Sequence, residues 1–420
     1  MSLSLKSNIV WTFGGNVVYA AAQWGLLVAL IKLGSIESAG SYSYAISVCA
    51  PVFMFSNLDL RSFQATDSKK VYSVEEYLGL RLVMTLMAGM MVALFIWEYI
   101  GSGSGFLMMA VVIIKMVESV SDMIYGTFQK EMRMDMMSKS MIYKGIISIV
   151  VSASVLIVTG NSGVSIMAVA LCWITFMVAV DIPKSYRLIR FDKPKIGSRS
   201  LSIIKASLPL GVAMLLISLA TNVPRYMVEE YMGLDQLAVF VSITYFIVAG
   251  STVVSAVGQS SLVPLRSHID SGNKSDFRKL AAYIVGLSAV IGISGCIISL
   301  TLGEYILRLF YNESFVQYKN IFVLTMCVGT LVYVSAILGY ILNSFQSFRS
   351  HSIVLGVAVL SGALGGLYLV PVHGLSGAVA TLGLTMGIRV LGSLAVLTIR
   401  MNDHFRNAPL GLAAGARVDA

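Results

Sequence analysis

Residues 111–133 read VVIIKMVESVSDMIYGTFQKEMR, and the charges within this stretch are the strongest indication of the fold class. The stretch begins in a run apolar enough to cross a bilayer, yet it contains Lys115, Glu118 and Asp122. Their spacing places all three side chains on one face of an α-helix. A charge at mid-bilayer costs about 2.5–3.5 kcal/mol on insertion scales. We therefore expect a polar stripe that lines a transport cavity, or alternatively an ion pair, Lys115 with Glu118, that only holds helices together.

The composition of the whole chain is that of an integral membrane protein. Hydrophobic residues make up 57% of the 420 positions and charged residues 12%, against about 25% in soluble domains. The net charge of +9 comes from basic residues in short connections between apolar runs, which is typical of cytoplasmic loops and not of a nucleic-acid surface. The four cysteines lie within apolar runs at irregular spacing: Cys49, Cys172, Cys296 and Cys327. We expect them to be small buried residues, without disulfides or a metal.

About twelve segments are long and apolar enough to span a bilayer, which takes about 20 residues. They are 9–31, 39–58, 77–97, 106–128, 141–158, 166–183, 208–224, 237–258, 280–302, 320–342, 352–372 and 377–399. Basic residues favour one set of connections by about five to one, so the positive-inside rule predicts that both termini are cytoplasmic. The longest connection on the other side, 303–319, is too short for a separate domain.

Short sequence matches predict that the chain consists of two repeated halves. Three pairs of segments recur in order, about 200–217 residues apart: 34–39 with 233–238, 127–129 with 344–346, and 160–163 with 374–377. An even number of spans in each half makes the halves parallel. We therefore predict an all-α protein with an N-terminal six-helix lobe at 1–190, a basic cytoplasmic linker at 191–206 and a C-terminal six-helix lobe at 207–407. A flexible tail at 408–420 is interpreted as vector-derived.

Several motifs spread over residues 1–400 resemble one group of transporters. They are Leu58-Asp-Leu-Arg61, residues 118–126 (ESVSDMIYG) with Gln129-Lys130, Ser207-Leu-Pro-Leu-Gly211 with Asn222-Val-Pro-Arg225-Tyr226, and His373-Gly-Leu-Ser-Gly377. In these the chain resembles the lipid-linked oligosaccharide (O-antigen, Wzx-type) flippases of polysaccharide biosynthesis. Those flippases belong to the multidrug/oligosaccharidyl-lipid/polysaccharide exporter superfamily.

The resemblance implies a function in O-antigen or lipopolysaccharide biosynthesis. The substrate would be an undecaprenyl-pyrophosphate-linked repeat unit, moved from the cytoplasmic to the periplasmic leaflet of a bacterial inner membrane. The resemblance also implies a V-shaped bundle with a central cavity that works by ion-driven alternating access. No bound cofactor is expected, only a proton or sodium gradient. The implied partners are membrane lipids and other polysaccharide assembly proteins, and the protein is expected to act as a monomer without nucleic acid.

A diphosphate that leaves water needs cationic partners, and a lysine or arginine facing a cavity is the simplest. Lys115 in the first half and Arg389 in the last span both fall near mid-bilayer. We expect these two side chains to clamp the diphosphate from opposite lobes. The alternatives are that Lys115 pairs with Glu118 or Asp122, and that Arg389 pairs with a carboxylate of its own half.

Five further residues are assigned to substrate binding. Arg61 and Lys205 lie at the cytoplasmic ends of their spans and could receive the pyrophosphate, or they are loop charges that snorkel to the surface. Asn16 and Gln23 share a face of the first span and, with Trp24, are assigned to the sugar path. Hydrogen bonding between helices is the alternative for these three.

Glu118 and Asp122 are the candidates for ion coupling, and Asp59 at the inner end of the second span is assigned to the same group. A cavity of low dielectric favours the protonated form of a carboxylate, which can then exchange a proton in a usable pH range. The alternative is a structural salt bridge to Lys115 or Arg61.

Other charges are interpreted as belonging to the surface. Asp181 is expected at the inner interface, and Arg225 in an outer ion-pair cluster with Glu229 and Glu230. The sequence contains neither a phosphate-binding Gly-Lys-Ser/Thr loop nor a metalloprotease motif, so we do not expect an enzyme. The alternatives are a multidrug or cation extruder of the same superfamily, a membrane polysaccharide polymerase or glycosyltransferase, or a scaffold within an assembly complex.

Overall fold

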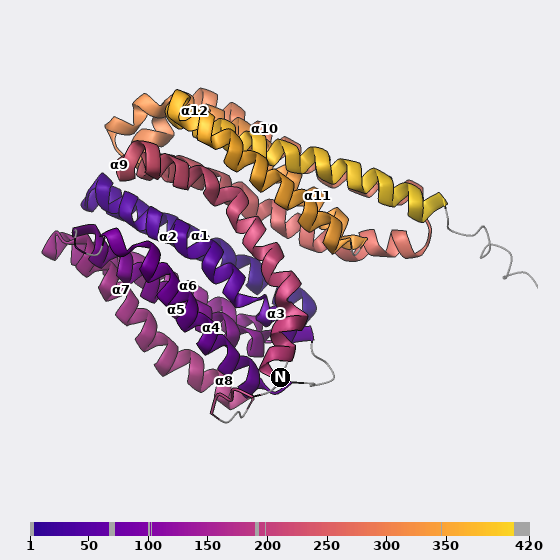
Figure 1. Cartoon of the computed structure of the whole chain (residues 1–420), viewed down its shortest axis with the longest axis horizontal. Coiled ribbons are helices and arrows are strands. Elements are labelled where there is room, and N and C mark those ends of the chain that lie inside the picture. The colour runs from indigo at the N-terminus through magenta and orange to yellow at the C-terminus, as the bar shows by residue number, and fades with distance from the viewer. Residues whose placement is uncertain are drawn as a thin grey trace, which may run out of the picture.

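The computed structural model describes residues 4–66, 72–99, 101, 103–189, 193–197, 199–345 and 347–406. All regular elements in this part of the chain are helices, as predicted. The helices form two lobes, α1 to α8 and α9 to α12 (Figure 1). The predicted tail at 408–420 lies outside the described residues.

The N-terminal lobe contains eight α-helices and two short irregular helices. They are α1 (Leu5–Leu33), α2 (Ile36–Asn57), α3 (Leu60–Thr66), α4 (Val74–Phe95), η1 (Trp97–Tyr99), α5 (Gly103–Lys130), α6 (Met134–Thr159), α7 (Ser162–Phe176), η2 (Met177–Asp181) and α8 (Ile182–Leu188). Polar caps fix several of the helix starts. Ser35 accepts a hydrogen bond from the amide of Ser38, and Ser73 forms a capping box with Glu76.

The C-terminal lobe has fewer and longer helices: α9 (Ser200–Asp270), α10 (Lys274–Phe310), η3 (Glu313–Tyr318), α11 (Lys319–Ser344) and α12 (Phe348–Arg406). Gly233 (φ 81°) interrupts α9 and Gly374 (φ 58°) interrupts α12, in a backbone region that favours glycine. In the N-terminal lobe the corresponding turns contain Gly34, after α1, and Gly160 (φ 63°), after α6. Two of the matches found in the sequence therefore lie at corresponding turns of the two lobes.

Nine helices in the described part of the chain are long and apolar enough to cross a membrane. Counting the two halves of α9 and of α12 separately, and adding α5 with its four charged residues, divides the described part of the chain into twelve segments. The twelve predicted spans can be placed on these segments, and their number stays a prediction.

Three boundaries in the structure differ from those of the predicted segments. The first half of α9 does not end at Pro224 but continues to Gly233, because proline fits helical φ and neighbouring helices of a membrane bundle can satisfy the carbonyl that its missing N–H leaves free. The outer connection at 303–319 is mostly helical, since α10 reaches Phe310 and η3 follows. α9 begins at Ser200, inside the range predicted as linker.

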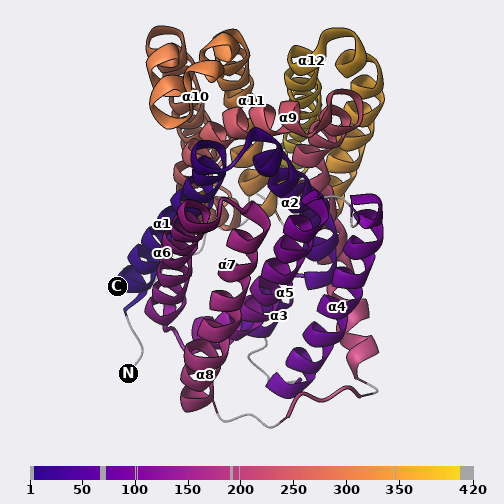
Figure 2. The same cartoon turned by 90° about the vertical axis from the view of Figure 1, so that its left-hand side faces the viewer.

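The two lobes form a V. They lie close together at the end where α1 turns into α2, which we call the outer end, and they diverge toward the inner end, where α1 begins and α12 ends (Figure 1). Figure 2 is viewed from the outer end and shows α1, α2 and α9 between the remaining helices of the two lobes. Gly40 of α2 permits the close approach there, because a Cβ at this position would overlap the carbonyl of Leu234 in α9.

Side chains from both lobes close the outer end. Trp24 Nε1 donates a hydrogen bond to Tyr311 Oη at 2.8 Å, and Tyr311 Oη donates to the carbonyl of Ser242 at 2.8 Å. The Trp24 ring lies 5.3 Å from the Phe246 ring and 4.5 Å from the Phe310 ring. This cluster of Trp24, Tyr311, Phe246 and Phe310, which we call the outer latch, joins α1 to α9 and α10.

Two further contacts strengthen the outer closure. Lys32 Nζ donates to the carbonyl of Leu309 at 2.8 Å. Tyr99 donates to Glu229, and burial raises the pKa of the Tyr99 phenol, so that this hydroxyl remains a donor. The structure is thus closed at its outer end.

The expectation that the chain has no disulfide was wrong. Cys296 of α10 and Cys327 of α11 are paired, with their Cα atoms 5.2 Å apart, whereas Cys49 and Cys172 are free. The paired residues lie 31 positions apart on neighbouring helices, and their spacing along the chain does not reveal the contact.

Candidate substrate and coupling sites

A cavity of about 730 Å³ lies between the lobes on the inner side of the outer latch. It is lined by Asn8, Ile9, Thr12, Phe13, Asn16, Tyr19, Ala20, Gln129, Met132, Met134, Val248, Ser251, Thr252, Ser255, Ala256, Gln259 and Ser260. All of these lining residues are uncharged, and more than half offer a hydroxyl or an amide. The second half of α9 forms one wall, and α1 with the end of α5 forms the other. We call this space the inter-lobe cavity.

The three residues assigned to the sugar path lie in different places. Asn16 lines the inter-lobe cavity. Gln23 accepts a hydrogen bond from Tyr42 at 3.1 Å, which joins α1 to α2 inside the N-terminal lobe. Trp24 belongs to the outer latch in this conformation. The structure therefore brings one of the three to the cavity.

Glu118 lies at the centre of a hydrogen-bonded group on α5. Lys115 Nζ lies 2.6 Å from Glu118 Oε2, and Tyr19 Oη of α1 donates to Glu118 Oε1 at 2.8 Å. The carboxylate therefore has one cationic and one neutral donor. The predicted pair of Lys115 and Glu118 forms, one helical turn apart on the polar face of α5.

Asp122 lies one turn further along α5 and is held by two arginines. Arg61 Nη1 is 3.3 Å and Arg81 Nη2 is 3.5 Å from its carboxylate oxygens. The Arg81 side chain is only 1% exposed and also donates to Asn57. Arg61 Nε donates to Gln129 at 3.0 Å, and Gln129 lines the inter-lobe cavity. The Arg61 guanidinium thus lies near the edge of that cavity.

A second, small cavity of about 90 Å³ lies inside the N-terminal lobe, next to Glu118 and Asp122. It is lined by Tyr19, Arg61, Glu118, Ser121, Asp122, Tyr125, Met141, Lys144 and Trp173. Its volume suits a few water molecules. We call it the N-lobe cavity. The polar face predicted for residues 111–133 therefore looks into the lobe interior, where Glu118, Ser121, Asp122 and Tyr125 line one wall.

A buried ion pair that the sequence reasoning missed lies on the far wall of the N-lobe cavity. Lys144 Nζ of α6 is 2.7 Å from Asp181 Oδ2, and the two side chains are 2% and 1% exposed. Lys144 also donates to Ser121 at 2.8 Å, and its amine lies within 5.8 Å of the rings of Tyr125, Trp173 and Phe176. We had expected Asp181 at the inner interface. The structure instead buries it inside the N-terminal lobe.

The π-helical turn η2 ends at Asp181, and such turns often mark functional positions. Asp181 Oδ1 is buried without a hydrogen-bond partner among the described residues. Lys144 lies inside the predicted span 141–158, near its start, and a lysine at that place was the signal that could have identified the pair. The position of its partner, 37 residues later, was not predictable from spacing.

The structure does not bring together the two cations of the predicted clamp. Lys115 is paired with Glu118. Arg389 lies inside the C-terminal lobe, where its Nη2 and the His351 ring pack against Gly339 of α11. Arg389 Nε is buried without a hydrogen-bond partner in the described part of the chain. Neither cation lines the inter-lobe cavity, so the clamp stays a prediction for another conformation.

The remaining assigned residues lie at the inner end. Lys205 is exposed near the start of α9. Asp59 lies in the turn between α2 and α3, has a positive φ of 47°, and accepts a hydrogen bond from Ser62 at 2.7 Å. In this conformation neither Lys205 nor Asp59 lines the inter-lobe or the N-lobe cavity.

Arg225 does not form the expected outer cluster with Glu229 and Glu230. Its Nη1 donates to Asn222 Oδ1 at 3.3 Å, one turn earlier on α9, while Glu229 accepts from Tyr99. Tyr245 of α9 has both Arg225 and Lys115 as electrostatic neighbours.

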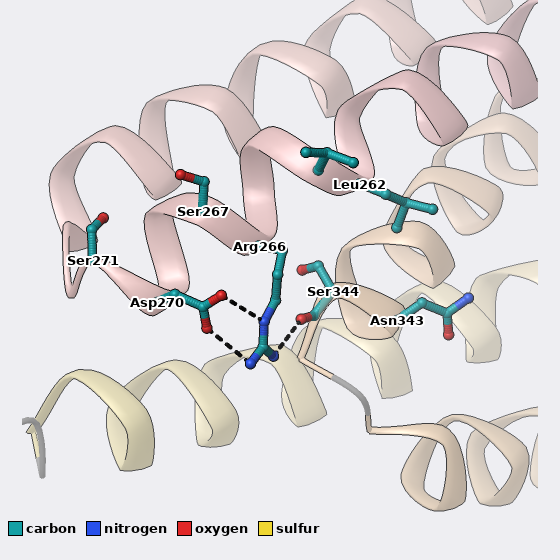
Figure 3. Close-up of a pocket in the computed structure, with 8 residues that line it drawn as sticks. Leu262, Arg266, Ser267, Asp270, Ser271, Asn343 and Ser344 are labelled. Carbon is teal, nitrogen blue, oxygen red and sulfur yellow. Dashed lines mark hydrogen bonds and ion pairs between the residues drawn. The ribbon is translucent and has the colours of Figure 1, made fainter. Parts of the chain in front are cut away.

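A groove of about 760 Å³ lies at the inner end of the C-terminal lobe, away from these groups. Figure 3 shows that Arg266 of α9 points to Asp270 and to the end of α11. Arg266 Nη2 lies 2.8 Å from Asp270 Oδ1, and Arg266 Nη1 donates to the carbonyl of Ser344 at 3.2 Å. We interpret Arg266 as a structural residue that joins α9 to α11. Its charge is balanced by Asp270.

Comparison with known proteins identifies relatives over nearly the whole chain. No protein-family model matches. The chain is 26% identical over 392 residues to the capsular polysaccharide biosynthesis protein CapF of Staphylococcus aureus, covering 92% of this chain and 98% of CapF. An inward-facing multidrug resistance MATE family transporter of the MOP superfamily superimposes with a TM-score of 0.70 at 12% identity, over 97% of both chains.

An outward-facing MATE transporter of the same superfamily gives a TM-score of 0.61 at 12% identity, over 95% of this chain and 96% of that chain. The chain is thus a multi-pass membrane protein with the fold of the MATE transporters of the MOP superfamily, and it is a homologue of a capsular polysaccharide biosynthesis protein.

Proposed function

We propose that the protein translocates an undecaprenyl-pyrophosphate-linked oligosaccharide repeat unit from the cytoplasmic to the periplasmic leaflet of a bacterial inner membrane, by ion-coupled alternating access. The observation that supports this most is the inter-lobe cavity, which offers hydroxyl and amide groups from both lobes. The likeness to CapF along almost the full length of both chains supports the same assignment.

The inter-lobe cavity suits a sugar head group. Its volume of about 730 Å³ falls in the range of about 300–1,000 Å³ that is typical of pockets enclosing a small ligand. On the α9 wall the side chains of Ser251, Ser255 and Gln259 offer donors and acceptors together. Sugar hydroxyls need partners of this kind, because a buried polar group without one is costly.

The surroundings of the cavity suit the lipid part. α1 presents large exposed apolar side chains at the cavity, among them Ile9 (59% exposed), which lines it, and its neighbour Val10 (69% exposed). A polyprenyl chain could lie along this face while the sugars occupy the polar interior. Arg61, near the cavity edge through Gln129, is the cation best placed to meet the diphosphate.

For the coupling ion we propose the carboxylates of α5. Glu118 and Asp122 line the N-lobe cavity, and each is paired with cations that a proton would release. Neutralising either carboxylate would free Lys115 or Arg61 for other partners. In this proposal, the release of these cations is the step by which an ion gradient changes the conformation of the N-terminal lobe.

The second candidate function is extrusion of lipophilic cations, which the likeness to multidrug MATE structures favours. A cationic drug would need a carboxylate as its partner. Glu118 and Asp122 are already held by Lys115, Arg61 and Arg81. We therefore place this function second, and a polysaccharide polymerase third.

The test is reconstitution of the purified protein into liposomes that contain a synthetic undecaprenyl-diphosphate-linked disaccharide. A soluble glycosyltransferase added outside would report the arrival of the disaccharide at the outer leaflet. We expect an imposed proton or sodium gradient to accelerate this arrival at least tenfold over protein-free liposomes. If the rates equal those of protein-free liposomes and the protein instead drives uptake of ethidium along the gradient, the flippase assignment fails and the extruder assignment takes its place.

A matched pair of variants localises the activity. Ser255→Tyr fills the inter-lobe cavity and should lower the rate at least tenfold. Ser271→Tyr makes the same change just beyond the end of α9, outside that cavity, and should leave the rate within about twofold. Equal rates in the two variants would remove the cavity from the substrate path.

A further inference from the structure

Tyr19 of α1 connects the two cavities. Among the residues that the structure describes, it alone lines both the inter-lobe cavity and the N-lobe cavity. Its position on α1 places it between the second half of α9 and the polar face of α5. A ligand in the first cavity and an ion-exchanging group in the second would therefore touch the same side chain.

The contacts of Tyr19 in the N-lobe cavity are specific. Its hydroxyl donates to Glu118 Oε1 at 2.8 Å, while Lys115 Nζ holds the other oxygen at 2.6 Å. The Tyr19 ring lies 6.2 Å from the ring of Trp173, which in turn faces Lys144. Packing therefore orients the phenol so that its hydroxyl reaches the carboxylate.

We propose that Tyr19 is the positioning residue that links occupancy of the inter-lobe cavity by the glycan to protonation of Glu118. This proposal rests on the proposed function. A carboxylate is stabilised by each hydrogen bond that it accepts in its charged form. A sugar that draws the Tyr19 hydroxyl into the inter-lobe cavity removes one of the two donors of Glu118, so proton binding from water competes better with Lys115.

The link must work in both directions, because the coupling free energy between two sites is reciprocal. A protonated Glu118 no longer accepts a charge-assisted hydrogen bond, so the Tyr19 hydroxyl is free to bind the sugar. Charged and titratable groups near Glu118 come from five helices: Lys115 and Tyr125 of α5, Tyr19 of α1, Tyr42 and Cys49 of α2, Lys144 of α6 and Tyr245 of α9. Of these, Tyr19 is the one that also lines the inter-lobe cavity.

The experiment measures protons exchanged on ligand binding. The purified full chain in lipid nanodiscs is titrated calorimetrically with the undecaprenyl-diphosphate-linked disaccharide, in buffers that differ in ionisation enthalpy. We expect the wild type to take up a substantial fraction of one proton for each ligand bound. Tyr19→Phe should lose at least half of this uptake, while its affinity falls by no more than about tenfold, as expected for one hydrogen bond.

A control separates the proposed role from a merely structural one. Tyr333→Phe removes a buried hydroxyl that donates to the carbonyl of Ile247 at 3.0 Å within the C-terminal lobe. Proton uptake by this variant should equal that of the wild type. Full wild-type uptake in Tyr19→Phe would overturn the link, and so would full uptake in Glu118→Gln, a variant that keeps Tyr19.

The failures of the link and of the proposed function can be told apart. If the wild type binds no disaccharide lipid, the proposed function fails and the link fails with it. If the wild type binds the lipid with no proton uptake, or if Tyr19→Phe retains all of the uptake, only the link fails.

Discussion

Replacing Lys144 by alanine should destabilise the N-terminal lobe more than any other loss of a single charge on α6. The substitution removes the cation 2.7 Å from Asp181 and the donor to Ser121, and it leaves a carboxylate that is 1% exposed. The second oxygen of Asp181 already lacks a partner in the described residues. Removing one member of a buried pair typically costs about 3–5 kcal/mol, because the remaining charge has no water to solvate it. We expect a loss in that range for Lys144→Ala.

The matched control lies five residues earlier on the same helix. Lys139 also pairs with an aspartate, Asp135 at 3.7 Å, but its side chain is 46% exposed. Lys139→Ala should therefore cost no more than about 1 kcal/mol. Replacing both members of the buried pair with apolar residues of similar volume, Lys144→Met with Asp181→Leu, should recover most of the loss, because no unpaired charge remains.

The assay is equilibrium unfolding in mixed detergent micelles, followed by tryptophan fluorescence. Trp173 is a suitable reporter, since its ring lies 5.6 Å from the Lys144 amine. A Lys144→Ala variant that stays within about 1 kcal/mol of Lys139→Ala would refute the reasoning, as would a double variant no more stable than Lys144→Ala alone. Either result would mean that water reaches Asp181.

Three other predictions concern the cycle. Gly40→Leu should force α2 away from α9 and lower the population of the outer-closed conformation severalfold. The measurement is the distance between spin labels at the outer end, which should lengthen. Gly356→Ala, which has open space around its Cβ, should leave that distance unchanged. Glu118→Gln and Asp122→Asn should each slow gradient-driven transport at least tenfold with normal expression, and wild-type rates in both would remove these carboxylates from coupling. Trp24→Phe removes the hydrogen bond of the outer latch and should raise thiol labelling of a cysteine placed beneath the latch about two- to tenfold, whereas equal labelling would mean that aromatic packing alone closes it.

The sequence predicted the fold well because its signals are local. Apolar runs mark the helices, and the three charges on residues 111–133 had to share one face because the helix repeat requires it. The glycine matches pointed to two repeated halves, and the structure places Gly233 and Gly374 at turns with a positive φ, which favours glycine. These inferences need only the chain within one or two helical turns.

The site was predicted less well because it depends on how helices rotate against each other. Lys144 and Asp181 meet only because α6 and η2 face one another, and Arg81 reaches Asp122 from a third helix. Arg389 was expected to face Lys115, but the rotation of α12 directs it to Gly339. Depth in the membrane can be counted from the sequence, whereas the direction in which a side chain points within a bundle cannot.

The glycine breaks at Gly233 and Gly374 have a consequence for how accessible the outer end of the fold is to other proteins. Because each reverses the chain almost without a connecting loop, the outer end presents very little backbone. A protease acting from that side would find few bonds to cut, and an antibody would find little surface to recognise. Of the described outer connections, the segment around η3 (Glu313–Tyr318) is the longest, so affinity tags and nanobody epitopes are best placed there.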